Sequence, residues 1–142
     1  MSPITRRILY IESHADTRLM LSTLLGLLDY QIVSAQSVTD GVSLARNERF
    51  DLYLLGDRYL DGTSIDLCRQ LRAFDLSTPI IIYSTATQAA ERTQAMMAGA
   101  QDYVGKPGDI IELVKRITHL VEREDSSASM AGVRSALAQR PH

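Results

Sequence analysis

The stretch FDLYLLGD (residues 50–57) carries the pattern from which the fold is predicted. Four consecutive apolar residues, Leu52 to Leu55, lie between Asp51 and Gly56. Short apolar runs that are bounded by polar or turn residues suit strands buried on both faces, as in a parallel sheet. The stretch therefore predicts a central strand of such a sheet.

The same pattern repeats on both sides of this stretch. Further short apolar runs occupy residues 8–11, 32–35, 80–83 and 103–104, and the second of them is weaker. Between the runs, apolar residues recur at helical spacing, in segments 19–28, 42–45, 65–71, 89–97 and 110–121. Five strands that are each followed by a helix predict an α/β fold with a parallel sheet and right-handed crossovers.

Length and composition are typical of one globular domain. The chain has 142 residues, of which we assign 1–123 to the domain. Segment 124–142 has no hydrophobic period and is predicted to be a disordered or weakly helical tail. Because no output domain follows, we expect the domain to act in trans or to be a piece of a longer regulator. The single cysteine, Cys68, excludes an internal disulfide and is predicted to be a small buried apolar residue.

Charge and hydropathy exclude two classes of partner. The net charge of −2 comes without a clustered basic face, which argues against direct nucleic-acid binding. No apolar run approaches the roughly 18 residues that a membrane span needs. The N-terminus also lacks the apolar core of a signal peptide. We therefore expect a cytoplasmic protein.

Ligands of a parallel sheet collect at the carboxyl ends of its strands. The candidate site therefore consists of the residues that directly follow the apolar runs: Glu12 and Ser13, Gly56 and Asp57, Ser84 and Thr85, and Gly105 and Lys106.

Several segments resemble the receiver domain of response regulators, the CheY-like family. They are FDLYLL (50–55), DGT (61–63), LCRQLR (67–72), TPIIIYS (78–84) and AGAQDYVGKP (98–107). The resemblance runs from about Arg7 to Glu122 and is specific, because independent pieces occur in the family's order and spacing. It implies a doubly wound, flavodoxin-like fold with strand order 2-1-3-4-5 and helices on both faces of the sheet.

The resemblance also implies a chemistry, the metal-assisted transfer of a phosphoryl group from a phosphohistidine to an aspartate at the end of the third strand. Acidic residues after the first strand help to hold Mg²⁺, and a hydroxyl residue and a lysine contact the phosphoryl oxygens. In this sequence Gly56 falls at the position of the accepting aspartate, and Leu60 replaces a proline of the following loop. Glu12 and Ser13 fall at the two acidic positions, and Ser84, Tyr103 and Lys106 match the hydroxyl residue, the aromatic switch and the lysine.

Asp57 is the candidate substitute for the missing acceptor. Because side chains alternate along a strand, an offset of one residue predicts that Asp57 points to the opposite face. A bulge at Gly56 would redirect it, since glycine tolerates the dihedral angles required. The simpler interpretation of Asp57 is a solvated loop residue or a turn former.

The sequence predicts a poor metal site. Glu12 offers one firm carboxylate, Asp57 is the second candidate ligand, and Ser13 is a weak ligand for Mg²⁺. Asp16 is expected to cap the first helix instead. Lys106 is predicted to pair with Glu12, and with Asp57 if it is redirected, at about 4 kcal/mol of Coulomb energy for a 4 Å pair. Such a pair would lock the pocket without phosphate; the alternative interpretation of Lys106 is a partly exposed lysine at a strand end. From the poor ligand set we expect no cofactor, with Mg²⁺ as the one alternative.

These observations favour a signalling module that binds proteins, with a histidine kinase or a downstream signalling protein as partner. The resemblance implies that the partner surface includes Tyr103 and parts of 88–98 and 109–120. A conventional phosphorelay through Asp57 is the alternative. A third hypothesis, a small enzyme or nucleotide-binding protein, lacks a glycine-rich phosphate motif. The apolar stripe of 110–121 is compatible with a homodimer, but packing on the chain's own sheet is favoured.

Overall fold

The computed structural model describes residues 5–86, 88–106 and 110–122. Five parallel strands form the sheet in the order β2-β1-β3-β6-β7. The predicted order 2-1-3-4-5 is therefore confirmed, because β6 and β7 are the fourth and fifth strands of the sheet along the chain. The strands are β1 (Arg7–Ile11), β2 (Gln31–Ala35), β3 (Leu52–Leu55), β6 (Ile80–Ser84) and β7 (Asp102–Gly105). The boundary at residue 123 and the tail 124–142 lie outside the described residues.

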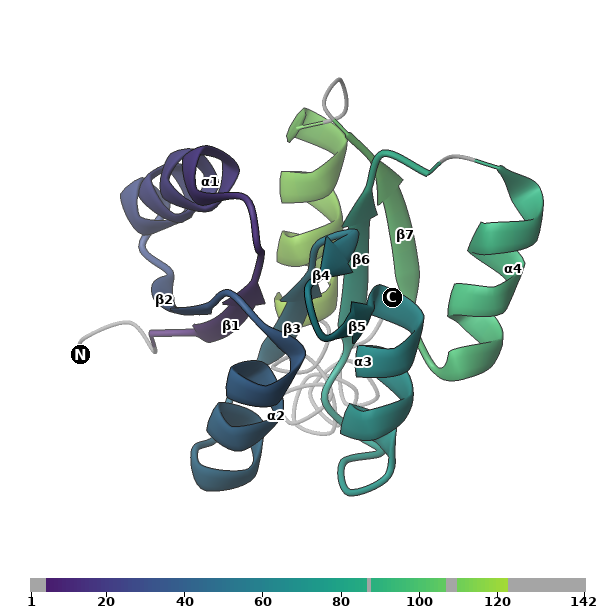
Figure 1. Cartoon of the computed structure of the whole chain (residues 1–142). Helices are drawn as coiled ribbons and strands as arrows, with labels where there is room; N and C mark the ends of the chain where they lie inside the picture. The colour runs from purple at the N-terminus through teal and green to yellow at the C-terminus, as the bar shows by residue number, and fades with distance from the viewer. Residues whose placement is uncertain (1–4, 87, 107–109, 123–142) are drawn as a thin grey trace, which may run out of the picture.

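A helix follows each of these strands, and the helices cover both faces of the sheet (Figure 1). They are α1 (Ala15–Leu27), α2 (Val38–Asn47), α3 (Ser64–Arg72), α4 (Ala89–Ala98) and a last helix over 110–122. None of the helices in the described ranges has the length and apolar character that crossing a membrane would require.

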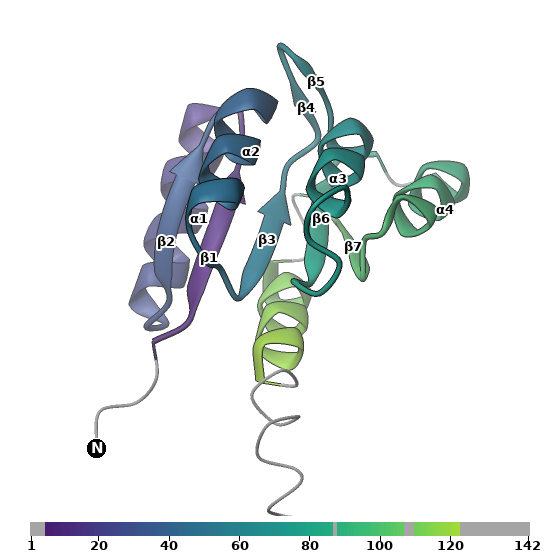
Figure 2. The same cartoon turned by 90° about the horizontal axis from the view of Figure 1, so that it is seen from below.

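Two apolar cores flank the sheet, because every side chain of β3 is buried and alternate residues point to opposite faces. Tyr53 and Leu55 lie in the core that the sheet forms with α2, α3 and α4. Leu52 and Leu54 lie in the core that it forms with α1 and the last helix. Figure 2 shows the same two helix layers from below.

The apolar stripe of the last helix lies against its own sheet. Leu113, Ile117, Leu120 and Val121 are buried in the core that α1 shares. The favoured interpretation of this stripe is therefore confirmed, and these buried residues do not supply a surface for a homodimer. Cys68 is fully buried, as predicted, and burial raises the pKa of its thiol.

One local prediction needs correction, and one element was not predicted. His14, and not Asp16, caps α1, since the His14 ring accepts a hydrogen bond from the Thr17 backbone N–H while Asp16 lies within the first turn. The loop after β3 also forms a small antiparallel hairpin, β4 (Arg58–Tyr59) and β5 (Gly62–Thr63), which the apolar pattern did not predict.

A polar cluster fixes the amino end of β6, whose other end carries Ser84. Asp75 accepts hydrogen bonds from the Tyr53 hydroxyl at 2.7 Å, the Thr78 hydroxyl at 2.6 Å, and the backbone N–H groups of Ser77 and Thr78, each at 3.0 Å. Partial burial acts to raise the pKa of Asp75, but these hydrogen bonds outweigh it and hold the pKa below its usual range.

The cluster predicts acid sensitivity. The folded-state pKa of Asp75 lies below the value of about 3.9 for an unfolded chain, so its stabilisation is present above that pH and declines as the pH falls below it. Asp75→Asn should therefore lower the free energy of unfolding at neutral pH, and it should cost less at about pH 2.5, where the unfolded-state carboxyl is protonated and much of the stabilisation has been lost. Urea unfolding at both pH values measures the difference, and Tyr53→Phe should give the same trend more weakly. An equal cost at both pH values would contradict this role.

Candidate functional site

The carboxyl ends of β1, β3, β6 and β7 open onto one cleft of about 1090 Å³. Its lining combines residues that follow different strands, including Glu12, Asp57, Ser84 and Lys106. Residues far apart in the sequence meet here because parallel strands end at the same edge of the sheet. Six of the eight residues that follow the apolar runs line this cleft; Gly56 and Gly105 are not among the lining residues.

A buried ion pair lies at the floor of the cleft. The Lys106 Nζ is 2.6 Å from the Glu12 Oε1, and the relative exposures of the two side chains are 10% and 2%. The other Glu12 oxygen accepts a hydrogen bond from the His14 backbone N–H at 3.2 Å. A buried carboxylate is tolerated only when it is paired and hydrogen-bonded, and Glu12 has both kinds of partner.

Gly56 lies directly against the Glu12 carboxylate. A Cβ atom at position 56 would be 2.8 Å from the Glu12 Oε1 and 2.9 Å from both Cδ and Oε2. The Gly56 backbone N–H lies within hydrogen-bonding distance of the Ile11 carbonyl oxygen at 2.8 Å and the Tyr59 hydroxyl oxygen at 2.9 Å. The carboxylate thus occupies the space in which a larger side chain at position 56 would begin.

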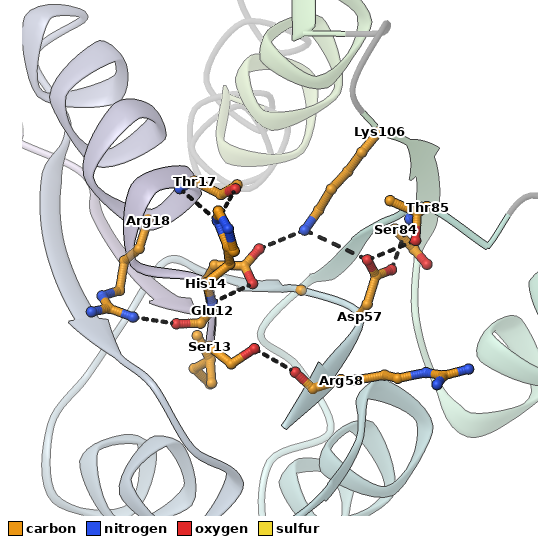
Figure 3. A network of polar contacts seen from close by, with 12 residues as sticks. Glu12, Ser13, His14, Thr17, Arg18, Asp57, Arg58, Ser84, Thr85 and Lys106 are labelled. Atoms are coloured by element: carbon orange, nitrogen blue, oxygen red, sulfur yellow. Dashed lines mark hydrogen bonds and ion pairs between the residues drawn. The ribbon is translucent and has the colours of Figure 1, made fainter. Parts of the chain in front are cut away.

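Asp57 points into the cleft, so the prediction that strand alternation turns it to the opposite face is wrong. The strand ends at Leu55, and the pleat therefore does not govern the side chain two residues later. The Asp57 Oδ2 is 3.6 Å from the Lys106 Nζ. Its Oδ1 accepts a hydrogen bond from the Thr85 backbone N–H at 2.8 Å, and its Oδ2 accepts one from the Thr85 hydroxyl at 3.0 Å. Figure 3 shows Lys106 reaching between Glu12 and Asp57.

Ser84 and Tyr103 both contact the loop that follows β6. The Ser84 hydroxyl accepts a hydrogen bond from the Ala86 backbone N–H at 3.0 Å, and the Tyr103 hydroxyl donates to the Ala86 carbonyl oxygen. The Arg92 guanidinium of α4 lies 5.5 Å from the centre of the Tyr103 ring. Tyr103 is only 6% exposed, and burial raises the pKa of its hydroxyl.

The oxygen atoms at which a metal ion would bind already have hydrogen-bond or ion-pair partners. Ser13 donates its hydroxyl proton to the Arg58 carbonyl oxygen at 2.7 Å (Figure 3). Both oxygens of Glu12 and both oxygens of Asp57 have the partners described above. Within the described ranges, no three His, Cys, Asp or Glu side chains gather as metal ligands would.

Tyr59 is a site residue that sequence reasoning missed. Its hydroxyl donates to the Ile11 carbonyl oxygen at 2.8 Å and lies beside the Gly56 N–H, so it ties the end of β1 to the end of β3. Burial raises the pKa of this hydroxyl. No apolar period marks Tyr59, because it lies in the hairpin outside the main sheet. The Thr85 contacts were also unforeseen, although Thr85 was among the strand-end residues.

The chain belongs to the response regulator receiver domain family, whose model matches residues 8–118. It is therefore a receiver module of two-component signalling and not an enzyme. The hypothesis of a small enzyme on the same fold is thereby set aside.

Known proteins agree with this assignment. The chain is 30% identical over 122 residues to the cell cycle transcriptional regulator CtrA of Caulobacter vibrioides, covering 86% of this chain and 53% of that protein. It is 32% identical over 123 residues to the transcriptional regulatory protein ResD of Bacillus subtilis, covering 86% and 50%. The chain thus spans about half the length of the curated relatives that it matches.

Solved structures support the fold. A CheY-like receiver domain protein from Methanospirillum hungatei superposes with a TM-score of 0.82 at 18% identity, covering 87% of this chain and 99% of that one. A two-component response regulator from Clostridium difficile gives 0.81 at 22% identity, covering 86% and 100%.

The close approach at Gly56 predicts a local steric cost. Gly56→Ala should lower the free energy of unfolding by about 1–3 kcal/mol, because the new Cβ displaces the Glu12 carboxylate from Lys106. In a Glu12→Ala background the cost of the same substitution should shrink, which a double-mutant cycle by urea unfolding measures.

Gly26→Ala is the matched control. A Cβ at position 26 meets nothing within 4 Å, and in a helix alanine is favoured over glycine by about 0.8–1.0 kcal/mol. A stability loss at position 56 that persists unchanged without Glu12 would contradict the steric account.

Proposed function

We propose that this receiver transmits its signal by binding proteins without accepting a phosphoryl group, and that Gly56 stands at the position of the family's accepting aspartate. Glycine has no side-chain nucleophile, so position 56 has no group to which a phosphoryl could be attached. The observation that carries the proposal is the Glu12 carboxylate, which lies against Gly56 and is paired with Lys106.

The donor set also argues against the Mg²⁺ ion that the family implies. Mg²⁺ prefers several free oxygen ligands, commonly carboxylates together with water and phosphate. Here Glu12 is bound to Lys106 and the Ser13 hydroxyl is bound to the Arg58 carbonyl. A divalent ion at Glu12 would compete with the Lys106 ammonium, which lies 2.6 Å from that carboxylate. The neutral Ser13 hydroxyl is a poor replacement for a second carboxylate. The residues as arranged do not fit the ion, and no step of the proposed function uses it.

Family membership implies an interaction with a histidine kinase, and a downstream signalling protein is the other proposed partner. The proposed contact surface consists of Tyr103, α4 and the last helix. The apolar side chains exposed there, Met96, Met97 and Ile111, are 45%, 83% and 73% exposed. Because Tyr103 contacts the loop that leads into α4, this surface would respond to the state of the cleft. We propose that the module works in the cytoplasm.

One observation favours a second function, phosphorelay through Asp57. Its carboxylate lies in the cleft and its Oδ2 is 3.6 Å from Lys106, a cation able to neutralise charge on a transferred group. The contacts of Thr85 weigh against this function. Its N–H and hydroxyl donate hydrogen bonds to Asp57 and are therefore not free to bind phosphoryl oxygens.

Intact-mass spectrometry distinguishes the two functions. The purified chain is incubated with acetyl phosphate and Mg²⁺, and its mass is followed over time beside that of Asp57→Ala. We expect no phosphate on either protein, because position 56 lacks a nucleophile and the hydrogen bonds from Thr85 lower the nucleophilicity of both Asp57 oxygens.

Phosphate that appears on the unaltered chain and is absent from Asp57→Ala would replace our proposal with the phosphorelay. A receiver domain that retains its aspartate serves as the positive control for the phosphodonor.

A further inference from the structure

We propose that Asp57 is a built-in anion in the cleft of this receiver and that it holds Tyr103 in its buried position. Its carboxylate would thereby set the conformation of the part of the proposed contact surface that Tyr103 and α4 form. This inference deepens the proposed function and rests on it, because a phosphoryl group on Asp57 would compete for the same contacts.

The first step of the argument is the geometry of the carboxylate. Each oxygen of Asp57 receives one hydrogen bond from Thr85, at 2.8 Å from the backbone N–H and at 3.0 Å from the hydroxyl. Hydrogen bonds to an ionised acceptor are stronger than those between neutral groups, and two parallel bonds also fix orientation. Thr85 is otherwise exposed and begins the loop between β6 and α4. A residue after β3 therefore positions the loop after β6.

The second step links this loop to Tyr103. Ala86, the next residue, donates its N–H to Ser84 and accepts the Tyr103 hydroxyl at its carbonyl oxygen. The position of that carbonyl depends on where Asp57 holds Thr85. If the loop moves, the Tyr103 hydroxyl loses its acceptor, and a buried hydroxyl without a partner is costly. Tyr103 would then leave its buried position.

The third step identifies Asp57, and not Glu12, as the exchangeable anion. One ammonium, Lys106, lies between two carboxylates, at 2.6 Å from Glu12 and 3.6 Å from Asp57. Glu12 is 2% exposed, whereas the Asp57 side chain is 22% exposed. Asp57 therefore has the longer ion pair and the better access to solvent. An external carboxylate can reach its place once its side chain is removed.

Fluorine NMR of the chain labelled with 3-fluorotyrosine tests the inference. The chain has six tyrosines, and Tyr103→Phe assigns the resonance of Tyr103 by its disappearance. In Asp57→Ala we expect this resonance to move toward the position of exposed fluorotyrosine. Added sodium acetate should return it toward the original position in Asp57→Ala and should leave the unaltered chain unchanged. Sodium chloride at the same ionic strength is the control: it should not return the resonance of Asp57→Ala, because it screens charges without placing a carboxylate in the cleft.

Two further variants complete the design. Thr85→Val removes the hydroxyl donor at an exposed position while keeping Asp57, and should shift the resonance in the same direction by a smaller amount. Asp16→Ala, on the exposed first turn of α1, removes a carboxylate elsewhere and should not shift it.

An unchanged Tyr103 resonance in folded Asp57→Ala would overturn the inference. If that variant does not fold, an unchanged resonance in Thr85→Val would overturn it equally. Both results are independent of the mass measurement, which tests whether a phosphoryl group is accepted at all.

Discussion

The ion pair between Glu12 and Lys106 is the constraint on which the rest of the site depends. Glu12 follows β1 and Lys106 follows β7, and the strand order places β3 and β6 between them. Adjacent strands are about 4.8 Å apart, so the two side chains must meet above the ends of the intervening strands. Gly56 lies at one of those ends and leaves room for the carboxylate. The absence of a side chain at that position and the presence of the pair are thus two aspects of one arrangement.

Asp57 is the second carboxylate within ion-pair distance of Lys106, at 3.6 Å. Thr85 donates two hydrogen bonds to it. This is how the cleft connects to the outer surface, because the loop held by Thr85 also accepts the Tyr103 hydroxyl. A receiver built in this way has its anion within the chain, and a partner that prefers one position of Tyr103 would act by shifting the balance between conformations.

Much of this arrangement follows from local pattern. Buried strands are indicated by apolar runs, and the rule that ligands gather at strand ends placed Glu12, Ser84 and Lys106 together. The predictions were wrong at residues just outside the regular strands and helices, where the alternation or helical spacing of apolar residues ends. Asp57 lies two residues past the last residue of β3, so the alternation that describes the strand no longer applies to it. His14 was overlooked as a helix cap because Asp16 is the more usual residue type for that role.

The sequence by itself determined the parallel α/β fold, the family resemblance and the presence of glycine at position 56. These features are set by residue type and spacing, which local propensity and apolar burial convert directly into strands and helices. Only the tertiary structure decided which way Asp57 points, that Thr85 binds both of its oxygens, and that Glu12 fills the space beside Gly56. Those contacts join residues that lie far apart in the chain, and they depend on backbone geometry beyond the strand ends that no sequence period specifies.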